Sequence, residues 1–278
     1  MGFVSKHEER DKKLPKFRKN LMDSIEKDLL NDDHVLTLFY GGSIGSRNTD
    51  LYSDIDLRIV VKPEEIGTYI SNKKTRPQMW GNILFIEDAH PLSIYTVVHY
   101  DSFIKVDTFY YKPKDIQPSV WLKNIKIVKD HNSIISTVQK QSLEMTYEPS
   151  LDEFEAWRTK FFANLHEAYR RLMRGEYYYA LKCIDSLRIS IVVGWYMNAG
   201  IQPNNFGDWA KYEGGRGCLE SWQLSLLRSW DCGRDSIEIM NVINNIVREF
   251  KNVHSSICSR LEINENNDWI NKIVARVL

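Results

Sequence analysis

The chain has 278 residues, of which 43% are hydrophobic and 27% charged, an ordinary globular composition that excludes a largely disordered protein. This length favours two domains and allows a core that needs no disulfide or structural metal ion. Lysine plus arginine and aspartate plus glutamate each number 37, so the formal net charge is zero, which argues against a long nucleic-acid substrate.

The cysteines and the apolar runs give no sign of an exported or membrane-spanning protein. The four cysteines are scattered without a Cys-x-x-Cys pair, which predicts reduced thiols. The N-terminal segment is charged and lacks the apolar stretch of a signal peptide. The longest apolar run, 189–201, is interrupted by Gly194 and Asn198 and falls short of a membrane span. We therefore expect a cytoplasmic protein that does not enter a membrane.

The first half of the chain is predicted to be mixed α/β. Apolar residues recur every four positions from Phe17 to Leu29, which predicts an opening amphipathic helix. A helix start is also indicated by Pro63 in a first turn. Runs rich in β-branched and aromatic residues predict strands at 35–40, 55–61, 82–87, 94–100, 103–109 and 125–129. The Asp101-Ser102 turn predicts a hairpin between the two strands that flank it.

From about Leu151 the apolar spacing becomes helical. A first helix ends at Gly175, and others are expected at 176–199, 219–230, 236–261 and 269–277. Short loops between such helices predict an antiparallel bundle. We expect five tryptophans in its core, namely Trp157, Trp195, Trp209, Trp222 and Trp230. Pro149 lies in an acidic stretch, so the predicted domains are 1–148 and 149–278, and the fold class is α+β.

The most informative segment is GGSIGSRNTDLYSDIDLRIV, residues 41–60. Asp54 and Asp56 are two positions apart at the start of a predicted strand, so both carboxylates project in the same direction. Two carboxylates ~4 Å apart would repel by roughly 4 kcal/mol at an effective dielectric constant of 20, which invites a divalent cation. Oxygen ligands with room for water and phosphate suit Mg²⁺ or Mn²⁺.

The residues around this pair suggest a nucleotide site. Glycine at Gly42 lets a phosphate approach the backbone, and Ser43 adds a hydroxyl donor. Ser46 and Arg47 lie in the following turn and could reach the same phosphates. Asp107, which we expect late in a neighbouring strand, could complete the metal site or act as general base. Taken singly, each of these features is more often a turn or a solvated acid than a site.

This arrangement resembles the polymerase-β-like nucleotidyltransferase superfamily, in which Gly-Ser is followed by Asp-x-Asp and by a third acid on a later strand. The sequence from Gly42 to Leu57 looks most like that of the antibiotic nucleotidyltransferases, the aminoglycoside and lincosamide enzymes. Those enzymes pair a catalytic domain, a mixed β-sheet flanked by helices, with a C-terminal helical bundle. The strict motif covers about fifteen residues, together with Asp107.

The resemblance implies an adenylyltransferase-like enzyme that moves a nucleoside monophosphate from ATP or another nucleoside triphosphate to a hydroxyl of a small molecule. Gly42 and Ser43 would hold the triphosphate, and Asp54, Asp56 and Asp107 would hold Mg²⁺ or Mn²⁺. Lys211, beside a glycine-rich loop of the helical domain, is a weaker candidate for clamping the phosphates, and a solvated loop explains it equally well. The resembling enzymes include monomers and dimers, so a homodimer is one expected form.

Two other functions remain open from the sequence. One is a catalytically idle nucleotide-binding module, which the intact set of three acids argues against. The other is nucleotidyl transfer to a protein or RNA acceptor, for which the zero net charge disfavours RNA. The acceptor, the hydroxyl that is modified and the preferred base are not readable from these residues.

Overall fold

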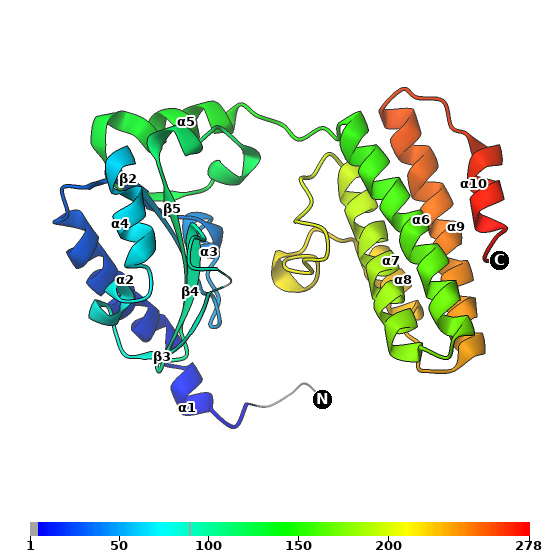
Figure 1. Ribbon diagram of the computed structural model, residues 1–278, viewed down its shortest axis with the longest axis horizontal. Coiled ribbons are helices and arrows are strands. Elements are labelled where there is room, and N and C mark those ends of the chain that lie inside the picture. The colour runs from blue at the N-terminus through cyan, green and yellow to red at the C-terminus, as the bar shows by residue number, and fades with distance from the viewer. Residues whose placement is uncertain (1–4, 89) are drawn as a thin grey trace. The chain divides into compact units, whose positions relative to one another are not determined.

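In the computed structural model, residues 5–88 and 90–278 are described, and the chain divides into two compact units, Met1–Met145 and Thr146–Leu278 (Figure 1). The first unit contains a mixed β-sheet with flanking helices, and the second is helical. The predicted α+β fold class is confirmed. None of the described helices is both long and apolar enough to cross a membrane.

The first unit is organised around a six-stranded sheet with the order β3-β4-β5-β2-β1-β6. Its strands are β1 (Val35–Tyr40), β2 (Ile55–Val61), β3 (Ile83–Glu87), β4 (Tyr95–Tyr100), β5 (Lys105–Tyr111) and β6 (Lys126–Asp130). All neighbouring strands are antiparallel except β2 and β5, which run parallel at the centre. Parallel neighbours begin at the same edge of a sheet, so residues early in β2 and β5 meet there.

Helices cover the two faces of the sheet unequally. The helices of this unit are α1 (Glu8–Asp11), α2 (Leu14–Leu30), α3 (Gly42–Gly45), α4 (Ile66–Ser71) and α5 (Ile134–Leu143). Helices α2 and α4 bury one face, where Ile25 and Tyr69 share a core with Leu57. Helix α5 covers part of the other face, where Ile135 packs with Phe39 and Val60. Alternate residues of β2 and β5 on this second face stay partly exposed, and they include polar groups.

The structure differs from the sequence predictions for this unit in two details. Strand β5 begins at Lys105 rather than at residue 103, because Phe103 has a positive φ of 64° and belongs to the turn. Helix α5 was not predicted, because its sequence begins with β-branched residues, which also favour strands. The predicted hairpin is confirmed, since β4 pairs with β5 in antiparallel register.

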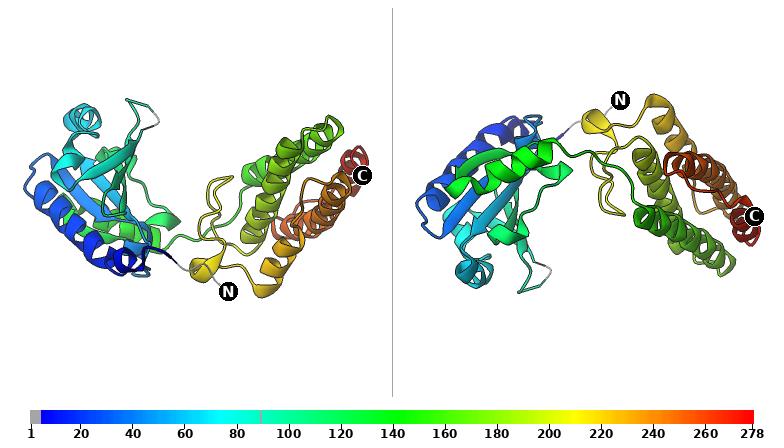
Figure 2. Two further views of the ribbon diagram at one scale, coloured as in Figure 1. Left: turned by 90° about the horizontal axis from the view of Figure 1, so that it is seen from below. Right: turned by 90° about the horizontal axis from the view of Figure 1, so that it is seen from above.

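The second unit is built on three long helices that lie side by side (Figure 2). Its helices are α6 (Leu151–Met173), α7 (Tyr177–Asn198), α8 (Ser221–Ser229), α9 (Ser236–Arg260) and α10 (Asn267–Val274). Helix α6 starts with a capping box, in which the Ser150 hydroxyl accepts from the Glu153 amide and the Glu153 carboxylate accepts from the Ser150 amide. Stacked rings of Phe161 and Phe250, 3.8 Å apart, join α6 to α9.

The tryptophan prediction is correct for three residues and wrong for two. Trp157, Trp195 and Trp230 are buried, whereas 51% of the Trp222 surface is exposed and Trp209 is partly exposed. Trp222 keeps its indole N–H at the surface, where it donates to the Glu220 carboxylate at 2.9 Å. An indole with a polar edge is stable at such a boundary position, so spacing alone overestimated its burial.

We predict that Gly194→Ala destabilises the second unit. A Cβ atom at this position of α7 would lie 2.6 Å from Val253 Cγ1 and 2.7 Å from the Trp157 ring, so two buried side chains would have to move. We expect a loss of about 1–3 kcal/mol in unfolding free energy, measured by thermal denaturation. Gly215→Ala, which meets no atom within 4 Å, is the control, and equal losses in both variants would contradict the packing argument.

Candidate active site

Three acidic residues lie at the edge where β2 and β5 begin. Asp54 directly precedes β2, Asp56 is its second residue, and Asp107 is the third residue of β5. Asp107 is therefore early in its strand and not late, as the sequence had suggested, because the strand starts two residues after the prediction. In the parallel register Asp56 is the direct neighbour of Asp107. Direct neighbours project from the same face of a sheet, so the two carboxylates share one face.

Lys105 joins two of these acids, although it is not among the site residues predicted from the sequence. Its Nζ lies 2.9 Å from Asp54 Oδ2 and 3.0 Å from Asp107 Oδ2. The signal was present in the sequence, because a strand residue two positions before Asp107 must share its face. Burial opposes a charged ammonium, but the bonds to both carboxylates raise the pKa of Lys105 above its ordinary value.

The Asp107 carboxyl is the most buried of the three. Burial raises the pKa of Asp107 above its usual value, although the Lys105 ammonium favours the charged form, and the nearby Asp54 and Asp56 charges add to the rise. Its Oδ1 is buried and has no hydrogen-bond partner in the described part of the chain. A buried carboxylate oxygen without a partner is costly, so this position favours a further cation or donor.

Helix α3 passes directly against Asp56. The Gly41 amide donates to the Asp56 carbonyl at 3.0 Å, and the next residue, Gly42, has a positive φ of 52°. A Cβ atom on Gly42 would lie 1.8 Å from Asp56 Oδ2, so only glycine fits there. Ser43 is buried, and its hydroxyl oxygen has no hydrogen-bond partner among the described residues. The structure thus brings Gly42 against Asp56, with Ser43 as the next residue of the chain.

The other residues predicted to contact phosphate have no described contact with the acidic residues of the site. Ser46 and Arg47 are exposed in the turn after α3, and Arg47 has a positive φ of 56°. Lys211 belongs to the second unit, where its side chain is exposed and its carbonyl accepts from the Tyr196 hydroxyl at 3.5 Å. These three side chains therefore remain predictions as nucleotide contacts.

A buried arginine holds the loop that leads to Asp54. Arg18, on α2, donates to the carbonyl oxygens of Ser53 at 2.8 Å, Asp50 at 3.0 Å and Leu51 at 3.5 Å. The Ser53 hydroxyl strengthens the loop by accepting from the Asp50 amide at 2.8 Å. Because these carbonyls immediately precede Asp54, Arg18 fixes the position at which the acidic segment enters β2.

Arg58 is a second basic residue on the acidic face that sequence reasoning missed. Its guanidinium carbon lies 4.0 Å from the centre of the Phe109 ring, and its Nη2 is 3.6 Å from Asp56 Oδ1. Stacking on an aromatic ring holds the planar guanidinium in place beside the acids. The alternation of β2 placed Arg58 on the face of Asp56, which is the signal that could have identified it.

The donor set fits a divalent cation, but it is not yet arranged as a finished metal site. The three carboxylates, including the unpartnered Oδ1 of Asp107, supply the oxygen ligands that Mg²⁺ and Mn²⁺ prefer. Across the described residues, no group of three or more acid, histidine or cysteine side chains already forms a cluster able to hold a metal ion. Lys105 Nζ lies between two of the acids, in contact with a carboxylate oxygen of each.

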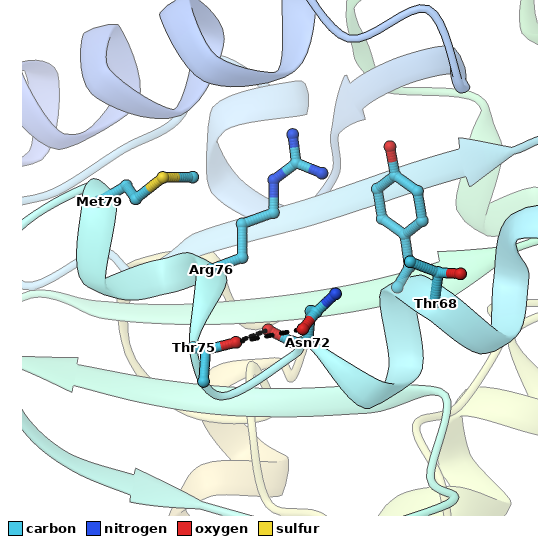
Figure 3. A pocket seen from close by; sticks show the side chains of 6 residues that line it. Thr68, Asn72, Thr75, Arg76 and Met79 are labelled. Atoms are coloured by element: carbon cyan, nitrogen blue, oxygen red, sulfur yellow. Dashed lines mark hydrogen bonds between the residues drawn. The ribbon is translucent and has the colours of Figure 1, made fainter.

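A cavity of about 380 Å³ in the first unit lies apart from the acidic residues of the site (Figure 3). It is lined by residues of α4 and the following turns, including Tyr69, Asn72 and Arg76. The Arg76 guanidinium is already paired with Asp28 at 2.8 Å and with Asp32 at 2.8 Å. Tyr69 belongs to the core on the α2 and α4 side of the sheet, away from the face of Asp56. This cavity is therefore not part of the acidic site.

Residues 16–275 match the family of streptomycin adenylyltransferases, which is nearly the whole chain. The chain belongs to this family. It is an adenylyltransferase-like enzyme of the antibiotic nucleotidyltransferase branch, as the resemblance implied, and nucleotidyl transfer is its reaction class. No curated protein matches the sequence.

Two solved structures are similar to this adenylyltransferase. An aminoglycoside 6-adenyltransferase from Bacillus subtilis has 12% identity and a TM-score of 0.44, with 94% of this chain and 95% of that chain covered. A nucleotidyltransferase-like protein from Exiguobacterium sibiricum has 11% identity and a TM-score of 0.46, with 88% and 78% covered.

We predict that Gly42→Ala lowers the turnover of adenylyl transfer about a hundredfold, because a displaced Asp56 carboxylate no longer meets its ligand in the productive geometry. Gly41→Ala is the matched control, since its Cβ would approach no atom closer than 3.9 Å. Steady-state rates of both variants test this prediction. Equal rates in the two would show that the close packing against Asp56 is irrelevant to the reaction.

We predict that Arg18→Met costs roughly 2–3 kcal/mol of unfolding free energy, because partly buried carbonyl groups lose a charged donor. The adenylyl-transfer rate should fall as well, since the acidic segment loses its anchor. Lys19→Met on the same helix removes only an exposed ion pair with Asp23 and should cost about 0.5 kcal/mol or less. Denaturant titration compares the two, and an equally stable Arg18 variant would refute the anchoring role.

Proposed function

We propose that this enzyme transfers AMP from ATP to a hydroxyl group of an aminoglycoside, with release of pyrophosphate and with Mg²⁺ or Mn²⁺ bound by Asp54, Asp56 and Asp107. The observation that carries the proposal is the parallel register of β2 and β5, which makes Asp56 and Asp107 direct neighbours on one face. The family to which the chain belongs supports an antibiotic acceptor, because its members are described as streptomycin adenylyltransferases.

The residues of this chain have separate tasks in the proposed reaction. Gly42 lies against Asp56, and its backbone without a side chain, together with the unpartnered hydroxyl of the adjacent Ser43, can receive a phosphate group. Arg58 is held 3.6 Å from Asp56 and supplies positive charge for phosphate oxygens on the same face. A divalent cation, when bound, would polarise the phosphate and neutralise negative charge on it.

The proposed reaction takes place at the α-phosphorus of the nucleotide. The acceptor oxygen attacks in line while the bond to the pyrophosphate oxygen breaks, and the hydroxyl proton passes to a carboxylate of the acidic group. The sheet contributes mainly fixed positions, because phosphoryl-group transfer depends on alignment and on charge stabilisation.

The direct test is removal of one acid at a time. Asp56→Asn and Asp107→Asn should each lower the rate on the order of 10³-fold or more, because charge stabilisation at the transferring phosphate is lost. Pyrophosphate release with ATP and Mg²⁺ would be measured across aminoglycosides, lincosamides and common metabolites. Asp101→Asn is the control, since this exposed acid lies in the β4–β5 turn and bonds only to Asn82 among the described residues.

The outcomes separate the proposed function from its alternatives. Near-wild-type turnover of Asp56→Asn would overturn the proposed chemistry, and nucleotide binding without pyrophosphate release from the unaltered enzyme would indicate an idle module. If pyrophosphate release required RNA or a protein and no small molecule supported it, the acceptor would be a macromolecule.

A further inference from the structure

The Lys105 ammonium occupies the place between Asp54 and Asp107 where a divalent cation would be expected. It lies 2.9 Å from an oxygen of the first carboxylate and 3.0 Å from an oxygen of the second. Both oxygens face the same nitrogen, so one positive centre bridges the two acids. These contacts have the length of charge-assisted hydrogen bonds.

The charges around this position explain why a lysine stands there. Asp54, Asp56 and Asp107 bring three negative groups to one edge of the sheet, and without a counter-charge they would repel one another. Arg58 approaches Asp56 at 3.6 Å, while Lys105 is the basic residue that contacts the other two acids. The side chains of Lys105 and Asp54 are only about one-third exposed, so solvent screens the pair incompletely.

Lys105 is also able to leave this position. A lysine side chain is a flexible four-carbon stem with a terminal charge, and 36% of this one is exposed to solvent. The strand fixes its backbone but not its ammonium group. An ammonium that leaves the two carboxylates stays on the face where Gly42 and Arg58 lie near Asp56.

We propose that Lys105 is a resident counter-ion, which holds Asp54 and Asp107 together before a divalent cation binds and which the cation must displace from both carboxylates. This inference rests on the proposed function, because it assumes that these acids bind the cation. It assigns Lys105 a role in the reaction cycle: the lysine weakens cation binding to the empty enzyme, and the displaced ammonium becomes available to an anionic phosphate. Cation and nucleotide binding are thereby linked.

The test measures Mn²⁺ binding to the full-length protein in the absence of nucleotide, by electron paramagnetic resonance of free Mn²⁺. Lys105→Met keeps the length of the side chain and removes its charge. We expect at least about tenfold tighter Mn²⁺ binding, because the cation no longer has to break an ion pair. Lys105→Gln is a second neutral variant in case the first folds poorly, and thermal denaturation checks the fold of each.

Two control variants test separately whether the effect depends on the position of Lys105 and on its charge. Lys114→Met removes a positive charge from an exposed turn, and Lys105→Arg keeps the charge at the same place, so both should bind Mn²⁺ as weakly as the unaltered protein. Folded Lys105→Met and Lys105→Gln variants that bind Mn²⁺ no more tightly than the unaltered protein would overturn the inference.

Asp54→Asn distinguishes failure of this inference from failure of the proposed function. Loss of Mn²⁺ binding and of transfer in Asp54→Asn, together with unchanged affinity in Lys105→Met, would refute the counter-ion role alone. Unchanged Mn²⁺ binding in Asp54→Asn would refute the cation site and the counter-ion role together.

Discussion

The parallel pairing of β2 with β5 is the constraint on which the acidic site depends. The other strand pairs of the sheet are antiparallel, and only this central pair starts both strands at one edge. Its register sets Asp56 beside Asp107 and, two positions further on, Arg58 beside Phe109. One backbone arrangement therefore determines the positions of both the negative and the positive side chains on this face. A register shift of one residue would turn the side chains of the shifted strand to the opposite face and separate Asp56 from Asp107.

Like charges are brought together here because several neighbouring groups offset the cost. Lys105 bridges two carboxylates, and Arg58 approaches the third. Arg18 donates hydrogen bonds to backbone carbonyls of the loop that leads to Asp54 rather than to the acidic side chains of the site. The assembly is stable without being fully satisfied, since one Asp107 oxygen and the Ser43 hydroxyl lack partners in the residues described. Unmet buried polar groups of this kind favour the binding of a water molecule, an ion or another ligand.

Most of the fold was predictable because its periodicities are strong. The six strands and the long helices α6, α7 and α9 follow from spacing of apolar residues. Short elements were harder: α5 begins with β-branched residues, and the start of β5 depends on the backbone angle of Phe103. Within the site, Asp54, Asp56 and Asp107 were visible as a pattern, whereas Lys105 and Arg58 were overlooked although strand alternation places them on the same face as Asp107 and Asp56. Arg18 could not be found from sequence, since its partners are backbone carbonyls 32 to 35 positions away.

The bonds from Arg18 have a consequence for protein engineering. The segment 41–60 carries the recognisable motif, yet the geometry of its last loop is set by a guanidinium on a helix that precedes it in the chain. Grafting this segment into an unrelated sheet would transplant the acids without their anchor. A successful transplant would need an equivalent buried donor beneath the loop, so the smallest portable unit includes α2 as well as the motif.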